Sequence, residues 1–202
     1  MSRNPLCLIL AFLILAAPAA AARKGKSTPT APGKYTEWQD EIDELEVVET
    51  FQLSDYTKVV VEPFDTGDTS LPEKDDNTYE PVKQVLSSPS GPIAEGLDEA
   101  LDGKIPVSEG KGGGEKTLLV RGRVLTMDPG SRAARYWAGF GAGAARAEVE
   151  GEIVDASTGQ VLVRFRQERR SGVGMAGGDY VKLMQRNLRT IGEDVALILR
   201  AF

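Results

Sequence analysis

The 202-residue chain contains no histidine and a single cysteine, Cys7. Without histidine it cannot form the Ser-His or Cys-His pair that activates the nucleophile of many hydrolases. Sites for zinc, copper or haem that need histidine or cysteine ligands are excluded for the same reason. Catalysis would have to depend on carboxylates, lysine, tyrosine or a Ser-Lys pair, and a metal would have to be a hard cation bound by oxygen. We therefore predict a protein that is not an enzyme and has no cofactor and no metal site.

Positive charge is also in short supply. The chain has 24 lysine and arginine residues against 30 aspartate and glutamate residues, so its formal net charge is −6. A general nucleic-acid binder, or a protein held on anionic membranes by charge, would need the opposite balance. We expect no nucleic-acid partner.

An apolar run extends from Leu6 to Ala17, with Arg3 before it and Pro18 and a series of alanines up to Ala22 after it. This order is typical of a secretory signal peptide, here residues 1–22 with cleavage after Ala22. The run is shorter than the about 20 apolar residues that a membrane span needs. We predict a periplasmic or secreted protein with no transmembrane span after cleavage.

The position of Cys7 argues against a lipid anchor. A lipidated cysteine follows the apolar run of its signal sequence, whereas Cys7 stands at the start of this run. We therefore expect that the protein is not a lipoprotein. Cleavage after Ala22 would leave no cysteine and no disulfide, although an exported chain could form one. Its stability must then come from a hydrophobic core.

Composition divides the rest of the chain in two. Residues 23–36 are basic and rich in Ser, Thr, Pro and Gly, and residues 37–49 hold seven acidic residues and no basic one. We predict a flexible linker over 23–50 and a single domain over 51–202. Four apolar residues of the acidic run have helical spacing, so a short amphipathic helix and an extended segment are both open. These residues are Trp38, Ile42, Leu45 and Val48.

Three later segments, 118–125, 147–153 and 161–166, alternate between an apolar and a largely charged face. Such alternation predicts strands of an antiparallel sheet with one face in water. If the three strands lie side by side in chain order, an acidic central strand lies between two basic ones. Opposite charges attract across strands, so the charges favour this order. The charged residues are Arg121 and Arg123, then Glu148, Glu150 and Glu152, then Arg164 and Arg166.

The connection between the last two strands sets their register. Gly159 in the left-handed region suits a three-residue loop, 157–159, with Ala156 opposite Gln160. Val163 would then face Ile153, and the apolar faces of both strands would coincide.

Two helices and one more strand complete the domain. Residues 58–64 form a β-branched run that predicts a buried strand. Pro92 at a first helical position and Gly103 as a stop predict a helix between them. Asp179 is a suitable N-cap for a long amphipathic helix that extends to Phe202. The order β-α-β-β-β-α predicts an α+β two-layer sandwich, with a mainly antiparallel sheet and helices on one face.

The segment Gly139–Gly143 contains three glycines that invite comparison with a phosphate-binding loop. Such a loop needs a strand before it and a helix N-terminus after it, whereas here a strand follows, so we do not expect nucleotide binding. The aromatic residues nearby would either close the edge of the core or form an exposed patch of the kind found at interaction hot spots. The candidate contacts for a partner are Arg132, Arg135, Tyr136, Trp137 and Phe140.

Three segments, Gly130–Arg135, Gly139–Gly143 and Asp155–Leu162, together resemble the domain of unknown function 4410 family over roughly residues 55–200. Its members are exported bacterial proteins and often lipoproteins, and this chain departs from the latter in lacking a lipidation cysteine. The arrangement is also similar, at the level of the fold, to the periplasmic domain of curli-secretion-type lipoproteins. The resemblance implies no established activity and no known catalytic residues.

These observations lead to one functional hypothesis and two alternatives. We expect a non-enzymatic module of the bacterial cell envelope that binds a protein or envelope partner through the Arg132–Gly143 loop. The first alternative is a carboxylate-dependent hydrolase acting on glycan or peptidoglycan. Glu148, Glu150 and Glu152 share one face, but the flanking arginines favour ion pairing over general acid catalysis. The second alternative is self-association through a free sheet edge.

Overall fold

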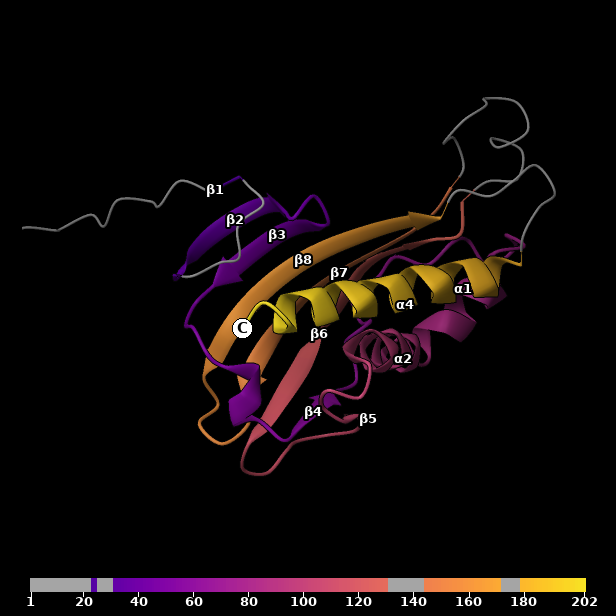
Figure 1. Ribbon diagram of the computed structural model, residues 1–202. Coiled ribbons are helices and arrows are strands. Elements are labelled where there is room, and N and C mark those ends of the chain that lie inside the picture. Colours follow the sequence, from indigo (N-terminus) through magenta and orange to yellow (C-terminus); the bar gives the residue numbers. More distant parts are fainter. Residues whose placement is uncertain (1–22, 25–30, 131–143, 172–178) are drawn as a thin grey trace, which may run out of the picture.

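The computed structural model describes residues 23–24, 31–130, 144–171 and 179–202. They form an eight-stranded sheet with helices packed on one of its faces (Figure 1). The strands are β1 Arg23–Lys24, β2 Gly33–Trp38, β3 Ile42–Val47, β4 Lys58–Val61, β5 Val107–Glu109, β6 Thr117–Asp128, β7 Ala145–Asp155 and β8 Val161–Ser171. The α-helices are α1 Tyr79–Leu86, α2 Ser90–Leu101 and α4 Tyr180–Leu199, and a 3-10 turn spans Leu53–Asp55. The α+β fold with helices on one face is confirmed.

The strands lie in the order β1-β2-β3-β8-β7-β6-β4-β5. The neighbours from β2 to β6 are antiparallel, whereas β4 is parallel to both β5 and β6, and β1 is parallel to β2. The sheet is therefore mixed, although most of its residue pairs are antiparallel. Parallel neighbours need a crossover connection, and α1 and α2 supply it between β4 and β5.

Residues 33–47 differ from the flexible linker that composition suggested, and from the alternative helix. They form the β2–β3 hairpin, which extends the sheet beyond β8. Trp38 and Ile42 are partners across this hairpin and are at most 1% exposed. Their spacing of four, which resembles a helical turn, arises because the chain reverses between them. The acidity of β3 is matched in space, since Glu44 and Glu46 lie opposite two arginines of β8.

The register of the central strands is as expected. Ile153 lies opposite Val163, and Arg121 lies opposite Glu152. The loop between β7 and β8 is one residue longer than expected, because Asp155 and not Ala156 pairs with Gln160, through an N–O distance of 3.0 Å. Gly159 has a φ of 73°, in the left-handed region where glycine was expected.

A bulge at Leu162 absorbs the extra residue. The pairing shifts between Ile153 and Val154, so that Leu162 has no partner of its own on β7. Its carbonyl oxygen instead accepts hydrogen bonds from the backbone N–H groups of Val48 and Glu49, at 2.8 and 3.1 Å. The bulge thereby restores the core-facing register and ties β8 to the chain that follows β3.

The long helix α4 covers the centre of the sheet (Figure 1). Its N-cap is the expected one, because the Asp179 carboxylate accepts a hydrogen bond from the backbone N–H of Val181 at 2.9 Å. Its apolar stripe is buried against the sheet and α2. The buried residues of the stripe are Met184, Leu188, Ile191, Val195 and Ile198.

Helices α2 and α4 touch through their backbones. A Cβ atom at Gly96 would lie 2.0 Å from the carbonyl oxygen of Arg189, and one at Gly192 would lie 2.1 Å from that of Ile93. Both positions therefore need glycine for close approach rather than for an unusual backbone angle. This crossing sets the distance between the two helices, and so how both lie on the sheet.

We expect Gly192→Ala to destabilise the protein by about 1–3 kcal/mol, because the added methyl group must push the helices apart. The higher helix propensity of alanine, worth about 1 kcal/mol, works in the opposite direction. Gly91→Ala is the matched control, since its Cβ would meet side-chain atoms at 3.7 Å, an ordinary contact. Urea denaturation of both variants measures the difference. Equal stability of Gly192→Ala and the wild type would contradict the tight crossing.

Candidate functional site

The partner-contact residues expected from the sequence lie outside the described residues. These residues are Arg132, Arg135, Tyr136, Trp137 and Phe140. The described residues that flank them are well fixed, because Ala145 pairs with Ser171 in the sheet and its carbonyl oxygen accepts a 3.0 Å hydrogen bond from the Asn187 side chain. The chain therefore leaves the same end of the sheet before Ala145 and after Ser171.

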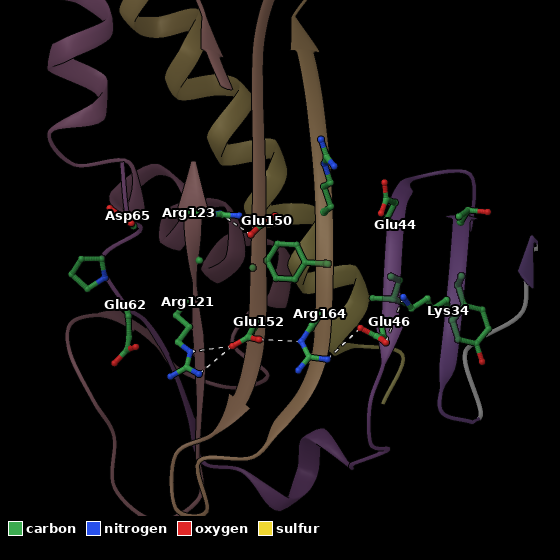
Figure 2. Close-up of a pocket in the computed structure, with 18 residues that line it drawn as sticks. Lys34, Glu44, Glu46, Glu62, Asp65, Arg121, Arg123, Glu150, Glu152 and Arg164 are labelled. Atoms are coloured by element: carbon green, nitrogen blue, oxygen red, sulfur yellow. Dashed lines mark hydrogen bonds and ion pairs between the residues drawn. The ribbon is translucent and has the colours of Figure 1, made fainter. Parts of the chain in front are cut away.

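The face of the sheet without helices carries a row of alternating charges, which Figure 2 shows end to end. Arg164 on β8 is 3.3 Å from Glu46 on β3 and 3.1 Å from Glu152 on β7. Glu152 is also 3.1 Å from Arg121 on β6, and Glu46 is 4.0 Å from Lys34 on β2. We call these five residues the first charged row.

A second charged row lies two residues further along the strands and consists of Glu44, Arg166, Glu150 and Arg123. Arg123 contacts Glu150 at 2.7 Å. Arg166 contacts Glu148 at 2.6 Å, diagonally, although it stands opposite Glu150. Hydrogen bonds to Glu148 raise the pKa of Arg166, and hydrogen bonds to Glu152 and Glu46 raise that of Arg164.

Between the two rows lies a trough of about 980 Å³ that crosses the strands. Its lining includes Leu45, Phe165, Gly151 and Gly122, each of which stands between two charged residues of its strand. The side chains of Leu45 and Phe165 are buried on the helix side, so the backbone of these residues forms the floor of the trough. Glu62 and Asp65 line the end beside β6 (Figure 2), and Pro63 also belongs to the lining.

The three grouped carboxylates of β7, Glu148, Glu150 and Glu152, are all engaged with arginines. Glu148 accepts from Arg166 and from Arg146 at 2.7 Å, while Glu150 and Glu152 belong to the charged rows. A general acid must carry a proton at the working pH, whereas pairing with arginine favours the deprotonated carboxylate. The face presents charged donors and acceptors in fixed positions, an arrangement suited to recognition.

A carboxyl group with a raised pKa lies elsewhere, between α4 and β8. Asp194 accepts hydrogen bonds from Gln167 at 2.9 Å and from Arg169 at 2.7 and 2.5 Å. Burial nevertheless raises the pKa of Asp194 to about 6, while the same carboxylate raises the pKa of Arg169. Asp194 lines neither the trough nor the smaller hollow beside it.

This polar cluster fastens the β2–β3 hairpin to the rest of the fold. Arg169 is 2.9 Å from the carboxylate of Glu41, and the side-chain amide of Gln167 donates to the Glu41 carbonyl at 2.8 Å. The sequence carries a signal for this cluster. Gln167 continues the apolar face of β8, and Asp194 lies beside the apolar stripe of α4, so each is a polar residue where an apolar one is expected.

Within the described ranges, no three acidic side chains gather as a metal site would require. None of the helices in the same ranges combines the length and apolar character needed to cross a membrane.

We expect Asp194→Asn to change how stability depends on pH. The folded-state pKa of about 6 exceeds the ordinary value of 3.8, so folding favours the protonated carboxyl. This stabilisation is complete below about pH 4 and is lost as the pH rises through about 6. The free energy of unfolding of the wild type minus that of Asp194→Asn should therefore fall by about 3 kcal/mol from about pH 3 to about pH 7. Chemical denaturation across this range measures it.

The control for this experiment is Asp98→Asn, which removes an exposed carboxylate from α2. Its unfolding free energy should follow that of the wild type across the pH range. A constant difference between the wild type and Asp194→Asn would contradict the raised pKa.

The fold can be compared with solved structures. A PelC dodecamer from Paraburkholderia phytofirmans is similar at 13% identity with a TM-score of 0.43, over 73% of this chain and 94% of that chain. A DUF330 protein from Xanthomonas campestris is similar at 14% identity with a TM-score of 0.37, over 72% of this chain and 85% of that chain. No curated protein matches the sequence. The similarity to curli-secretion-type lipoproteins stays a prediction.

The family resemblance of the glycine-rich and turn motifs is confirmed. The family model described as domain of unknown function DUF4410 matches residues 59–177 of the 202 residues. This match includes all but the first residue of β4, the crossover helices and the three central strands. The chain belongs to the DUF4410 family.

Proposed function

We propose that the protein is a non-enzymatic module of the bacterial cell envelope that binds a protein or envelope partner through the Arg132–Gly143 loop. The observation that carries the proposal is the state of the carboxylates on the open face. Glu148, Glu150 and Glu152 are each hydrogen-bonded to arginine, which supports a binding module over a carboxylate-dependent hydrolase.

The loop is the favoured contact because of its composition and its place. Arginine and the large aromatic residues are the side chains that most often dominate binding energy at interfaces. Residues 132–143 combine them with glycines, between the ends of β6 and β7. A loop at one end of a rigid sheet is a common location for binding residues, because the scaffold holds its ends in place.

The location in the envelope follows from the signal-peptide pattern over residues 1–22. On this proposal the mature protein begins at Arg23 and works in the periplasm or outside the cell. Hydrolysis of glycan or peptidoglycan is the weaker alternative. It needs a protonated carboxyl in a cleft, whereas Asp194, whose pKa is raised, bonds to Arg169 and Gln167.

Cross-linking in the envelope, followed by affinity purification, tests the proposal. We expect Trp137→Ala and Arg135→Ala each to reduce recovery of the partner by tenfold or more, because truncating a hot-spot residue costs about 2 kcal/mol or more. Leu71→Ala is the control for loss of an exposed apolar side chain, and Lys104→Ala the control for loss of an exposed charge. Unchanged recovery with both loop variants folded would overturn the proposal.

A further inference from the structure

Within the two charged rows, the signs of the charges alternate from strand to strand. In sheet order, Lys34 on β2 is positive, β3 is negative, β8 is positive, β7 is negative, β6 is positive, and Glu62 and Asp65 after β4 are negative. Positions at equal distances on the two sides of the boundary between β8 and β7 carry opposite signs. This holds for β8 and β7, for β3 and β6, and for β2 and the segment after β4. The two charged rows are therefore antisymmetric in charge about this boundary, whereas beyond them Glu148 lies opposite Glu168, and Arg146 opposite Arg170, with like signs.

An antisymmetric pattern is complementary to a second copy of itself. A two-fold axis parallel to the strands, placed over the boundary between β8 and β7, brings each strand of one copy over its mirror position in the other. Arg164 then faces the second copy's Glu152, Glu46 faces its Arg121, and Lys34 faces its Glu62. The second charged row obeys the same rule, with Arg166 over Glu150 and Glu44 over Arg123.

The pattern also excludes other arrangements. A two-fold axis perpendicular to the strands would place every strand over its own equivalent and set like charges against each other, which is costly in a contact. Moving the parallel axis to a neighbouring boundary keeps opposite signs but pairs fewer strands. The alternation thus selects one orientation and one register.

We propose that the protein forms a two-fold dimer in which the open, helix-free faces of two copies meet in this register. The occupant of the face is a second copy, because it carries the complementary pattern on the same strands. Within the lining of the trough, five positive side chains stand against six negative ones, so the negative charge of the whole chain is not concentrated there. The contact is polar and consists of the two charged rows of each copy. We therefore expect a weak dimer that dissociates as the salt concentration rises.

Sedimentation velocity of the exported protein tests this dimer. We expect dimers at about 0.1 M salt and monomers at about 1 M, because the Debye length falls from about 10 Å to about 3 Å. A wild type that is monomeric at low salt and high concentration would overturn the proposal. So would a dimer that is insensitive to salt.

Two charge reversals give a sharper test. Glu152→Arg alone would oppose arginine to arginine across the axis, and Arg164→Glu alone would oppose glutamate to glutamate, so each variant should be monomeric. Mixed together they should form a heterodimer, because position 164 of each copy then meets an opposite charge at position 152 of the other. Circular dichroism and urea denaturation check that both variants fold.

The mixing experiment separates the proposed face from other routes. A variant that merely loses stability cannot regain association from a partner carrying the other reversal. Association through a sheet edge would persist in both single variants, and that outcome would overturn the proposal. Reversing Glu99 on α2 to arginine is the control, since this residue lies on a helix away from the face and should leave dimerisation unchanged.

Discussion

The structure depends on one constraint: helices cover only one face of the sheet. Side chains alternate between the faces of a strand, so burying Val120, Ile153 and Val163 under the helices places their charged neighbours in water on the other side. Those charges are then close to the charges of adjacent strands, and like signs would repel. Strand order is therefore tied to charge. The basic strand β8 lies between the acidic strands β7 and β3, and the ion pairs of Arg164 extend to both.

This constraint explains how much of the fold could be predicted from the sequence. Each of the strands β6, β7 and β8 shows two signals in its own sequence: an alternation of apolar residues, and charged residues of mainly one sign between them. The order and register of the three strands follow from these two signals together. Helix α4 likewise shows its stripe and its Asp179 cap in one continuous segment. The β2–β3 hairpin could not be found in this way, because Trp38 and Ile42 meet only after the chain reverses, and the acidic residues of β3 find arginines more than a hundred residues away.

The parallel strand β4 and the polar cluster show two further limits. Strand β4 pairs in parallel with both β5 and β6, and no local pattern in residues 58–61 indicates either partner. The sequence shows Asp194 and Gln167 as polar residues on apolar faces. Their role in a hydrogen-bonded cluster could be recognised only once the structure placed Arg169 and Glu41 beside them. The ion pairs of the open face could be predicted from the sequence. The trough between the two charged rows could not, because it depends on the floor that Gly122, Gly151 and their neighbours form in the folded sheet.

Pairing within the open face also determines which contacts it can make. An isolated charge loses much of its hydration when a partner covers it, and only an opposite charge in good geometry repays that loss. Each arginine of the two rows already has a carboxylate at 3.3 Å or less, so part of its hydration has been exchanged for protein contacts before any partner arrives. Covering such a face with an apolar surface would still leave the remaining donors and acceptors without hydrogen-bond partners. A surface that continues the same alternation satisfies them, which is why a polar and charged partner suits this face better than an apolar one.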